Sequence, residues 1–316
     1  MSQLTIRQQL LESLLISDEQ LNRIIVRSPH TYKQYNIPKK NGGLRAIAQP
    51  ARATKYLQHW LINNIFNDLN VHSAAAAYQK GCSIKKNAQY HANNSYIAKF
   101  DFINFFPSIK EPDIKAHLIS HFGERLTEND LSDIVRISCI QLNGRSDFSL
   151  SIGAPCSPVI SNSIMYEFDR RVVDWCGENN IRYTRYADDL TFSTNVKGVT
   201  SHVESYIRDV VRDLAYPRLR FNRKKTTHLS KKNQRRVTGL ILTNDGDVSI
   251  GRSKKREISS LIHKFTIRQL PDDEVSRLQG LLGFSKGVEP RFIYRMNEKY
   301  GKDVISTIFK YRKKDK

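Results

Sequence analysis

The pattern of apolar and polar positions predicts a chain that mixes helices with short strands. Two apolar stripes at helical spacing open the sequence: Leu10, Leu11, Leu14 and Leu15, then Leu21, Ile24 and Ile25. The second stripe follows Ser17, which together with Gln20 makes a capping-box signature. We therefore expect two N-terminal helices that bury these stripes in a core.

Strand-like segments follow, with breaker residues between them. Residues 32–37 and 44–48 are expected to pair across a turn that runs from Pro38 to Gly43. The further strand-like segments are residues 96–100, 183–186, 190–193 and 237–242.

Helical patterns separate these strands. Residues that mark one amphipathic helix are Leu57, Trp60, Leu61, Ile65 and Leu69. The pattern is helical again over residues 111–142, up to an Asn143-Gly144 turn, and after a loop rich in breakers it resumes from about Val159 to Trp175. From Arg252 onward the chain is helical and basic. The fold class expected from this order is α+β.

Two acidic segments stand at the ends of expected strands. Asp188 and Asp189 lie in the turn between two strands, and Asp101 ends the strand before Phe102. An Asp pair in a turn, taken alone, is most often only a turn, because Asp bonds its own backbone there. Two such segments side by side would make a carboxylate clamp for two divalent cations, as phosphoryl transfer requires.

The composition limits the kinds of molecule that the protein is expected to bind. The 316 residues carry a formal net charge of +20, which indicates a polyanionic partner such as nucleic acid. A membrane is the weaker candidate, because no run of 18 apolar residues exists and the N-terminus lacks a signal-peptide pattern. The four cysteines form no C-x-x-C and indicate neither a zinc site nor a disulfide framework. We expect a cytoplasmic protein.

Taken in order, the motifs of residues 30–245 resemble the reverse transcriptases, and within them the bacterial retron class. These motifs are Leu44 to Ile47, Phe100-Asp101 with Phe105-Phe106, Gly153 to Pro158, Tyr186 to Asp189, Asn222 to Thr226, and Val237 to Leu240. Asn87 to His91 resembles the retron N-A-x-x-H element, and Val237 to Gly239 its V-T-G element. The chain departs from the pattern at Ile152, where many relatives have Gln.

The resemblance implies a right-hand polymerase fold of fingers, palm and thumb, with an antiparallel palm sheet. Residues 1–95 would hold the N-terminal helices and fingers, residues 96–245 the palm with inserted fingers helices at about 110–150, and residues 246–316 a basic helical thumb. The implied activity is RNA-directed DNA polymerisation. Two alternatives stay open: a non-retron reverse transcriptase with a 3′-hydroxyl primer, and a non-catalytic RNA-binding protein on the same scaffold.

The resemblance also implies the catalytic residues. Asp101, Asp188 and Asp189 would hold two Mg²⁺ ions, with Mn²⁺ as a substitute ion. Lys225 matches the lysine proposed to protonate the leaving pyrophosphate, and a plain phosphate contact is an equal alternative. Arg45, with Lys39 or Lys40, would meet the triphosphate of the dNTP.

Further contacts follow from the same resemblance. Phe106, five residues after Asp101, would select dNTPs by excluding a 2′-hydroxyl. The other nucleotide-binding residues would be Phe102, Gly153, Ala154 and Pro155. Nucleic acid would be contacted by Val237, Thr238 and Gly239 at the primer end, and by Arg252, Lys254, Lys255 and Arg256 in the thumb. For Asn87 and His91, RNA contact and a structural pair are even alternatives.

Retron membership would imply specific partners. The enzyme would copy a cognate structured non-coding RNA from the 2′-hydroxyl of a guanosine, which yields branched msDNA. A separate effector protein and a role in antiphage defence would complete the system.

Overall fold

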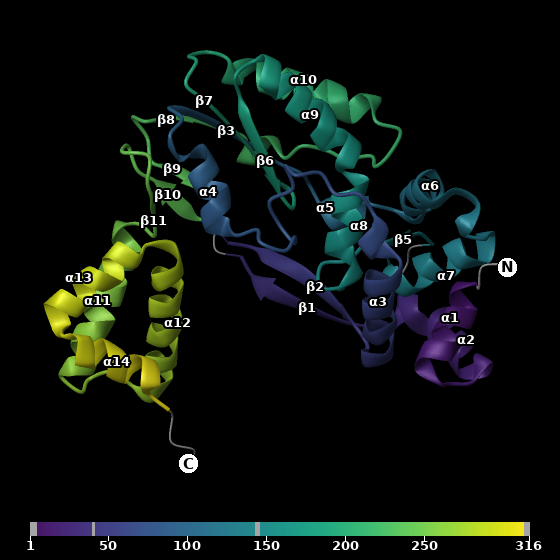
Figure 1. Cartoon of the computed structure of the whole chain (residues 1–316), viewed down its shortest axis with the longest axis horizontal. Helices are drawn as coiled ribbons and strands as arrows, with labels where there is room; N and C mark the ends of the chain where they lie inside the picture. The colour runs from purple at the N-terminus through teal and green to yellow at the C-terminus, as the bar shows by residue number, and fades with distance from the viewer. Residues whose placement is uncertain (1–4, 40–41, 143–145, 313–316) are drawn as a thin grey trace. The chain divides into compact units, whose positions relative to one another are not determined.

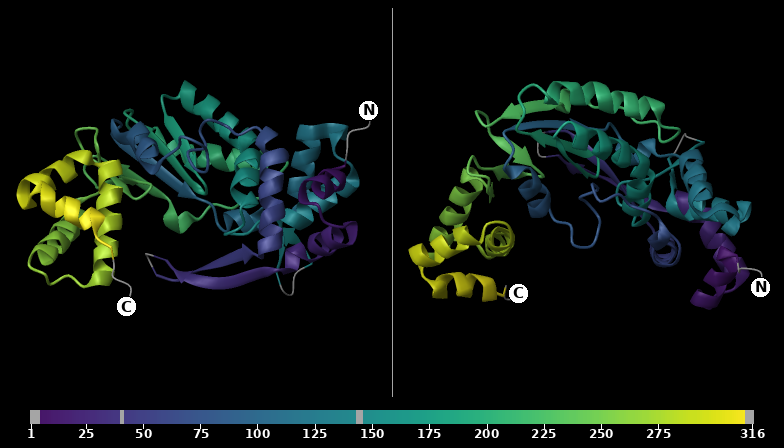
Figure 2. Two further views of the ribbon diagram at one scale, coloured as in Figure 1. Left: turned by 60° about the horizontal axis from the view of Figure 1, so that its bottom comes forward. Right: turned by 45° about the horizontal axis from the view of Figure 1, so that its top comes forward.

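The structure is a computed structural model that describes residues 5–39, 42–142 and 146–312. It contains two compact units (Figures 1 and 2). Unit 1 comprises the described parts of residues 1–80, 98–192 and 198–227, and unit 2 those of residues 81–97, 193–197 and 228–316. The expected α+β class is confirmed, while the division into fingers, palm and thumb stays a prediction.

Unit 1 begins with the two expected helices, α1 (Ile6–Leu14) and α2 (Asp18–Arg27). The capping box of Ser17 and Gln20 is present at the start of α2, so the sequence signature is confirmed. Leu15, however, is the left-handed cap of α1 and 90% exposed, because the helix ends one residue before it.

Strands β1 (Tyr32–Pro38) and β2 (Leu44–Pro50) form the expected antiparallel hairpin. Figure 2 shows it as a long ribbon. Part of its turn, including Lys40, lies outside the described residues. Helix α3 (Arg52–Asn64) follows, and Leu69 lies just beyond the short helix after it.

A four-stranded sheet of order β6-β7-β3-β8 carries the acidic residues. Its strands are β3 (Tyr96–Asp101), β6 (Arg182–Tyr186), β7 (Asp189–Thr194) and β8 (Thr227–Ser230). Helix α9 (Tyr166–Glu178) packs on β6, and α10 (Thr200–Asp213) packs on α9 (Figure 1). The apolar core of unit 1 includes Phe100, Phe102 and Phe192.

The remaining elements of unit 1 are further helices, 3₁₀ turns and the two-stranded sheet β4-β5. They are α5 (Phe105–Ser108), α6 (Glu111–Phe122), α7 (Glu128–Ser138), β4 (Ile140–Gln141), β5 (Phe148–Ser149), α8 (Cys156–Ile164) and the 3₁₀ turns Ser28–His30, Phe66–Asp68, Gly123–Arg125 and Arg223–Lys225. The helix expected from Val159 to Trp175 is wrong in its bounds: α8 begins at Cys156, and a break at Met165 separates it from α9. Pro158 is accommodated because the first turn of a helix needs no backbone donor.

Unit 2 includes α4 (Ile84–Ala92), a small sheet and the helices that follow this sheet. The sheet has the order β11-β10-β9, and its strands are β9 (Arg235–Val237), β10 (Leu240–Leu242) and β11 (Val248–Ser249). The helices are α11 (Arg252–Thr266), α12 (Asp272–Val288), α13 (Pro290–Tyr300) and α14 (Lys302–Lys310). None of the helices in the described part of the chain combines the length and apolar character that crossing a membrane needs.

The single strand expected over residues 237–242 is wrong. Val237 pairs with Leu240, so Thr238 and Gly239 form a two-residue hairpin turn with φ of 45° and 81°. Positive φ at both turn residues matches the twist of a β-hairpin. The Thr238 hydroxyl donates to the Ile84 carbonyl at 3.0 Å, which helps to hold a residue type that rarely adopts this conformation.

Candidate active site

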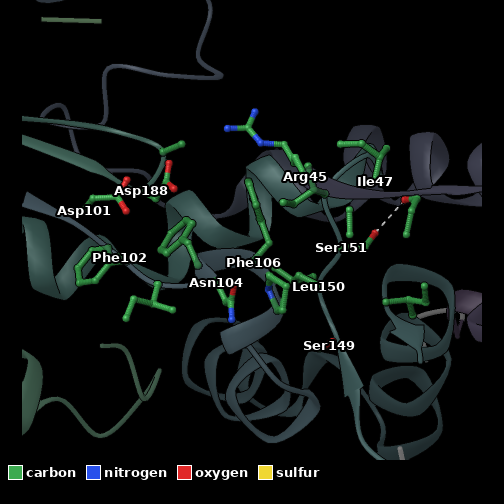
Figure 3. Close-up of a pocket in the computed structure, with 18 of the residues that line it drawn as sticks. Arg45, Ile47, Asp101, Phe102, Asn104, Phe106, Ser149, Leu150, Ser151 and Asp188 are labelled. Carbon is green, nitrogen blue, oxygen red and sulfur yellow. Dashed lines mark hydrogen bonds between the residues drawn. The ribbon is translucent and has the colours of Figure 1, made fainter. Parts of the chain in front are cut away.

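Asp101 and Asp188 lie next to each other, as the sequence predicted for the two acidic segments. Asp101 ends β3, and the amide of Phe102 donates to the Asp188 carbonyl at 3.2 Å. This bond ties the end of β3 to the turn between β6 and β7. Figure 3 shows both carboxylates in one pocket, together with Arg45 and Phe106.

A buried charge network lies behind the acidic turn. Arg185 is fully buried and pairs with Asp169 of α9, with 2.6 Å between Arg185 Nη2 and Asp169 Oδ2. The guanidinium also donates to Asn162 Oδ1 at 3.0 Å and to the Ala187 carbonyl at 3.3 Å. Ala187 has φ of 56°, so the network holds the residue before Asp188 in a left-handed turn.

Lys225 reaches the other side of the carboxylate pair. Its Nζ lies 2.8 Å from both Oδ1 and Oδ2 of Asp101. The Asn222 amide donates to the Asp101 carbonyl at 2.7 Å, which places the 3₁₀ turn of Lys225 beside β3. Lys225 is 59% exposed at its side chain, so its ammonium is free to exchange partners.

The negative charge of the site is concentrated. Burial, and then the charges of Asp101 and Asp189, raise the pKa of Asp188 to about 6. Burial raises the pKa of Asp101 as well, although Lys225 opposes the shift and Asp189 adds to it. Asp101 and Asp188 therefore both resist ionisation, and a cation between them would relieve the repulsion.

The residues fit divalent cations by their chemistry. Carboxylate oxygens are the hard ligands that Mg²⁺ prefers, and Asp101 and Asp188 supply them from adjoining elements. Within the described ranges, no three His, Cys, Asp or Glu side chains are already arranged around a common metal position. The Lys225 ammonium instead neutralises Asp101, and a bound cation would replace this positive charge.

The pocket measures about 500 Å³ and contains more than the predicted residues. Arg45, Phe106 and Lys39 line it, as their predicted roles require. The lining residues that the sequence analysis missed include Gln34, Tyr78, Asn104, Ser149, Ser151 and Asn222. Asn222 stood inside a recognised motif, whereas Tyr78 comes from a segment with no motif.

Phe102 is packed among other aromatic side chains. Its ring stacks on Phe221 and Phe105 at centroid distances of 4.8 and 5.8 Å, and the residue is 1% exposed. Phe102 nevertheless belongs to the lining of the pocket, so its contact with a nucleotide stays a prediction. The backbone amide of Phe102 fixes Asp188.

Gly153 approaches protein backbone. A Cβ at Gly153 would lie 3.0 Å from the Ala48 carbonyl oxygen and 3.0 Å from Ile47 Cγ2. The Ala48 amide donates to the Ile152 carbonyl at 2.8 Å, so the loop docks on β2. Ala154 is buried, and Pro155 caps α8. Their predicted nucleotide contacts stay predictions.

Replacing Gly153 by alanine is expected to destabilise the protein by about 2 kcal/mol, because φ is 117° and the new Cβ meets β2. Thermal unfolding measures the effect. Gly283→Ala is the matched control: Gly283 is exposed in α12 with open space around it, so alanine should stabilise by about 0.5–1 kcal/mol. Equal unfolding temperatures for both variants would contradict the close approach at Gly153.

In unit 2, the predicted RNA contacts Asn87 and His91 are buried, at 3% and 0% exposure. His91 Nδ1 lies 2.7 Å from the Ser193 hydroxyl, which also accepts a bond from Asn94 at 2.8 Å. Burial favours the structural alternative for both residues, because a side chain without surface cannot meet RNA.

The other predicted nucleic-acid contacts of unit 2 differ in exposure. The Val237 side chain is buried, and Gly239 is exposed at the hairpin tip beside Thr238. In α11, Lys255 pairs with Glu289 at 2.6 Å and Lys254 lies 4.7 Å from the centre of the Phe284 ring. Arg252 and Arg256 are exposed. These contacts stay predictions.

Comparison with known proteins identifies the family. The family described as reverse transcriptase (RNA-dependent DNA polymerase) matches residues 37–242. The chain is 37% identical to the retron Ec83 reverse transcriptase of Escherichia coli, over 89% of this chain and 90% of that protein. It is 34% identical to the retron Ec73 reverse transcriptase of Escherichia coli, with 89% and 90% covered. Among solved structures, a telomerase from Candida albicans gives a TM-score of 0.49 at 11% identity, over 94% of this chain and 61% of that one. The chain therefore belongs to the reverse transcriptases, the RNA-directed DNA polymerases with a right-hand fold, and among them to those of bacterial retrons.

Proposed function

We propose that the protein copies a cognate structured non-coding RNA into branched msDNA, primed from the 2′-hydroxyl of a guanosine in that RNA. The observation that carries the proposal is the similarity to retron reverse transcriptases across nearly the whole of both chains. The paired carboxylates in a nucleotide-sized pocket support a catalytic protein rather than a binding scaffold. The net charge of +20 suits an RNA partner and an RNA–DNA product.

Asp101 and Asp188, with Asp189 as a third carboxylate, would hold two Mg²⁺ ions or Mn²⁺ in their place. When bound, such ions lower the pKa of the attacking hydroxyl and neutralise the triphosphate. The bond from the Phe102 amide to the Asp188 carbonyl joins the end of β3 to the β6–β7 turn, which would preorganise the two carboxylates for the ions.

Lys225 and Arg45 would act on the phosphates. The ammonium of Lys225 bonds Asp101 and lines the pocket. A cation held by Asp101 would take over this charge balance, and Lys225 would then be available to donate a proton to the leaving pyrophosphate. Arg45 of β2 is exposed in the pocket and offers a planar fork of donors to the triphosphate oxygens.

Phe106→Ala is expected to admit ribonucleotides, because the Phe106 ring lines the pocket. Its contact with the Phe105 ring holds it there. An alanine opens the space that a 2′-hydroxyl needs. The ratio of kcat/KM for dNTP over rNTP should fall by about tenfold or more on an annealed RNA template, while Phe106→Tyr keeps the discrimination. An unchanged ratio in Phe106→Ala would remove the sugar-gate role.

We further propose, from the retron resemblance, a separate effector protein and a role in antiphage defence. The test of the central proposal is expression of the gene with its flanking region, followed by extraction of total nucleic acid. A small DNA that is sensitive to debranching and absent with Asp188→Asn is the expected result. DNA synthesis on an annealed primer with no branched species would indicate a reverse transcriptase that uses a 3′-hydroxyl primer. A protein inactive in both assays would favour the RNA-binding alternative.

A further inference from the structure

We propose that Tyr78 contacts the base pair formed between the template and the incoming nucleotide, with its ring as the contact surface. Tyr78 lines the same pocket as Asp188, Arg45 and Phe106. It is 53% exposed, although aromatic side chains in the rest of the pocket are covered more fully. The inference depends on DNA polymerisation and not on the proposed 2′-hydroxyl priming.

The backbone of Tyr78 is held in an unfavourable conformation. Its φ is 62°, in the left-handed region that costs an L-residue about 1–2 kcal/mol. Such a conformation persists only where the surrounding structure imposes it, and it occurs frequently at ligand-contacting positions. Here the residue with the strained backbone is an aromatic residue that lines the pocket instead of packing in the core.

The buried network of Arg185 and Asn162, which also holds the catalytic turn, fixes the backbone next to Tyr78. The Ala76 amide donates to the Arg185 carbonyl at 2.7 Å, and the Arg185 amide donates to the Ala74 carbonyl at 2.8 Å. Asn162 Nδ2 donates to the Ala77 carbonyl at 2.9 Å, while its Oδ1 accepts from the Arg185 guanidinium. Arg185 and Asn162 thus hold the residues just before Tyr78, and Arg185 also holds the residue just before Asp188.

The other aromatic rings that line the pocket have different partners. Phe102 and Phe105 are 1% and 3% exposed and stack on each other, and Phe106 packs against Phe105. Tyr78, by contrast, is about half exposed where it lines the pocket. A base stacked on an aromatic ring contributes about 1–3 kcal/mol, and the contact tolerates every base because each has a π-face.

The electrostatic surroundings keep this ring neutral. Burial raises the pKa of Tyr78, the charges of Asp188 and Tyr186 raise it further, and Arg45 lowers it. The hydroxyl therefore stays protonated at the pH of polymerisation and adds no negative charge beside the triphosphate. This leaves the ring as the surface that a base meets.

Steady-state synthesis on an annealed RNA template and DNA primer tests the proposal. Tyr78→Ala should raise the KM for each of the four dNTPs about 5- to 100-fold. Tyr78→Phe should keep the wild-type KM, and the Kd for the primer–template without dNTP should not change. Tyr56→Ala is the control, because Tyr56 is 62% exposed in the same unit and does not line the pocket.

Three results would overturn the proposal. An unchanged KM together with an unchanged primer–template Kd in Tyr78→Ala would show that no base is contacted. Equal defects in Tyr78→Phe and Tyr78→Ala would assign the contact to the hydroxyl and not to the ring. A weaker primer–template Kd with unchanged KM would place Tyr78 against the existing duplex. Loss of msDNA with normal primer extension would instead concern the proposed priming alone.

Discussion

Replacing Asp188 by asparagine is expected to abolish DNA synthesis and to leave the fold at least as stable as before. The variant removes a carboxylate that would hold the cations, and losing such charge stabilisation costs several kcal/mol of barrier, or about 10³-fold in rate. The fold should not suffer, because Asp188 repels Asp101 and Asp189 in the wild type. Primer extension and thermal unfolding measure the two effects.

The stability gain has a defined pH dependence. A carboxyl whose pKa rises from 3.8 to about 6 on folding costs stability when ionised, on the order of 2–3 kcal/mol above pH 6. The cost shrinks as the pH falls from 6 and vanishes below about 4, where the carboxyl is protonated in both states. In EDTA, Asp188→Asn should therefore unfold at a higher temperature than wild type at pH 7.5, and at nearly the same temperature at pH 4.

A matched surface variant separates this effect from general changes of charge. Asp174→Asn removes a carboxylate that is 61% exposed on α9, and it should change neither rate nor unfolding temperature measurably. Mg²⁺ should raise the unfolding temperature of wild type and of Asp174→Asn, but not of Asp188→Asn. Full activity in Asp188→Asn would refute the assignment of the catalytic carboxylate.

The sequence predicted the elements that carry strong local signals. The capping box at Ser17, the β1–β2 hairpin and the two strands joined by the Asp188 turn are confirmed, although Asp189 is already the first residue of β7. Periodicity and turn chemistry determine such elements locally, and the motif order then pairs Asp101 with Asp188. The juxtaposition of these two residues follows from the sheet order, which puts β7 beside β3.

The features that the sequence did not predict depend on tertiary contacts. Thr238 occupies a left-handed turn position with the help of a bond to the Ile84 carbonyl, so no local pattern announced that hairpin. The burial of Phe102 and His91 depends on partners far away in the chain, Phe221 and Ser193. Tyr78 stands outside every motif because its role is set by contacts to Arg185 and Asn162 through its neighbours.

Asp169→Asn is expected to destabilise unit 1 and to displace the catalytic turn. Asp169 Oδ1 accepts bonds from the Tyr183 hydroxyl at 2.7 Å and from Arg185 Nε at 2.9 Å, and Oδ2 accepts from Arg185 Nη2 at 2.6 Å. Asparagine would leave the fully buried guanidinium of Arg185 without a counter-charge. Breaking such a pair costs about 3–5 kcal/mol, which corresponds to a fall of roughly 10 °C in Tm.

The control for this variant uses the same helix and the same ion types in a solvated setting. Arg170→Gln breaks pairs with Glu167 and Asp174 on the exposed face of α9, where solvent screens the charges, and should leave Tm unchanged. Because Arg185 also bonds the Ala187 carbonyl, Asp169→Asn should lower kcat of the folded fraction even well below its Tm. A normal kcat at 20 °C with a lowered Tm would show that the Asp169–Arg185 network contributes to stability but not to catalysis. An unchanged Tm would show that the buried Arg185 does not depend on the Asp169 carboxylate for its charge balance. It would contradict the Arg185–Asp169 pair as the interaction that positions both the acidic turn and the Tyr78 segment.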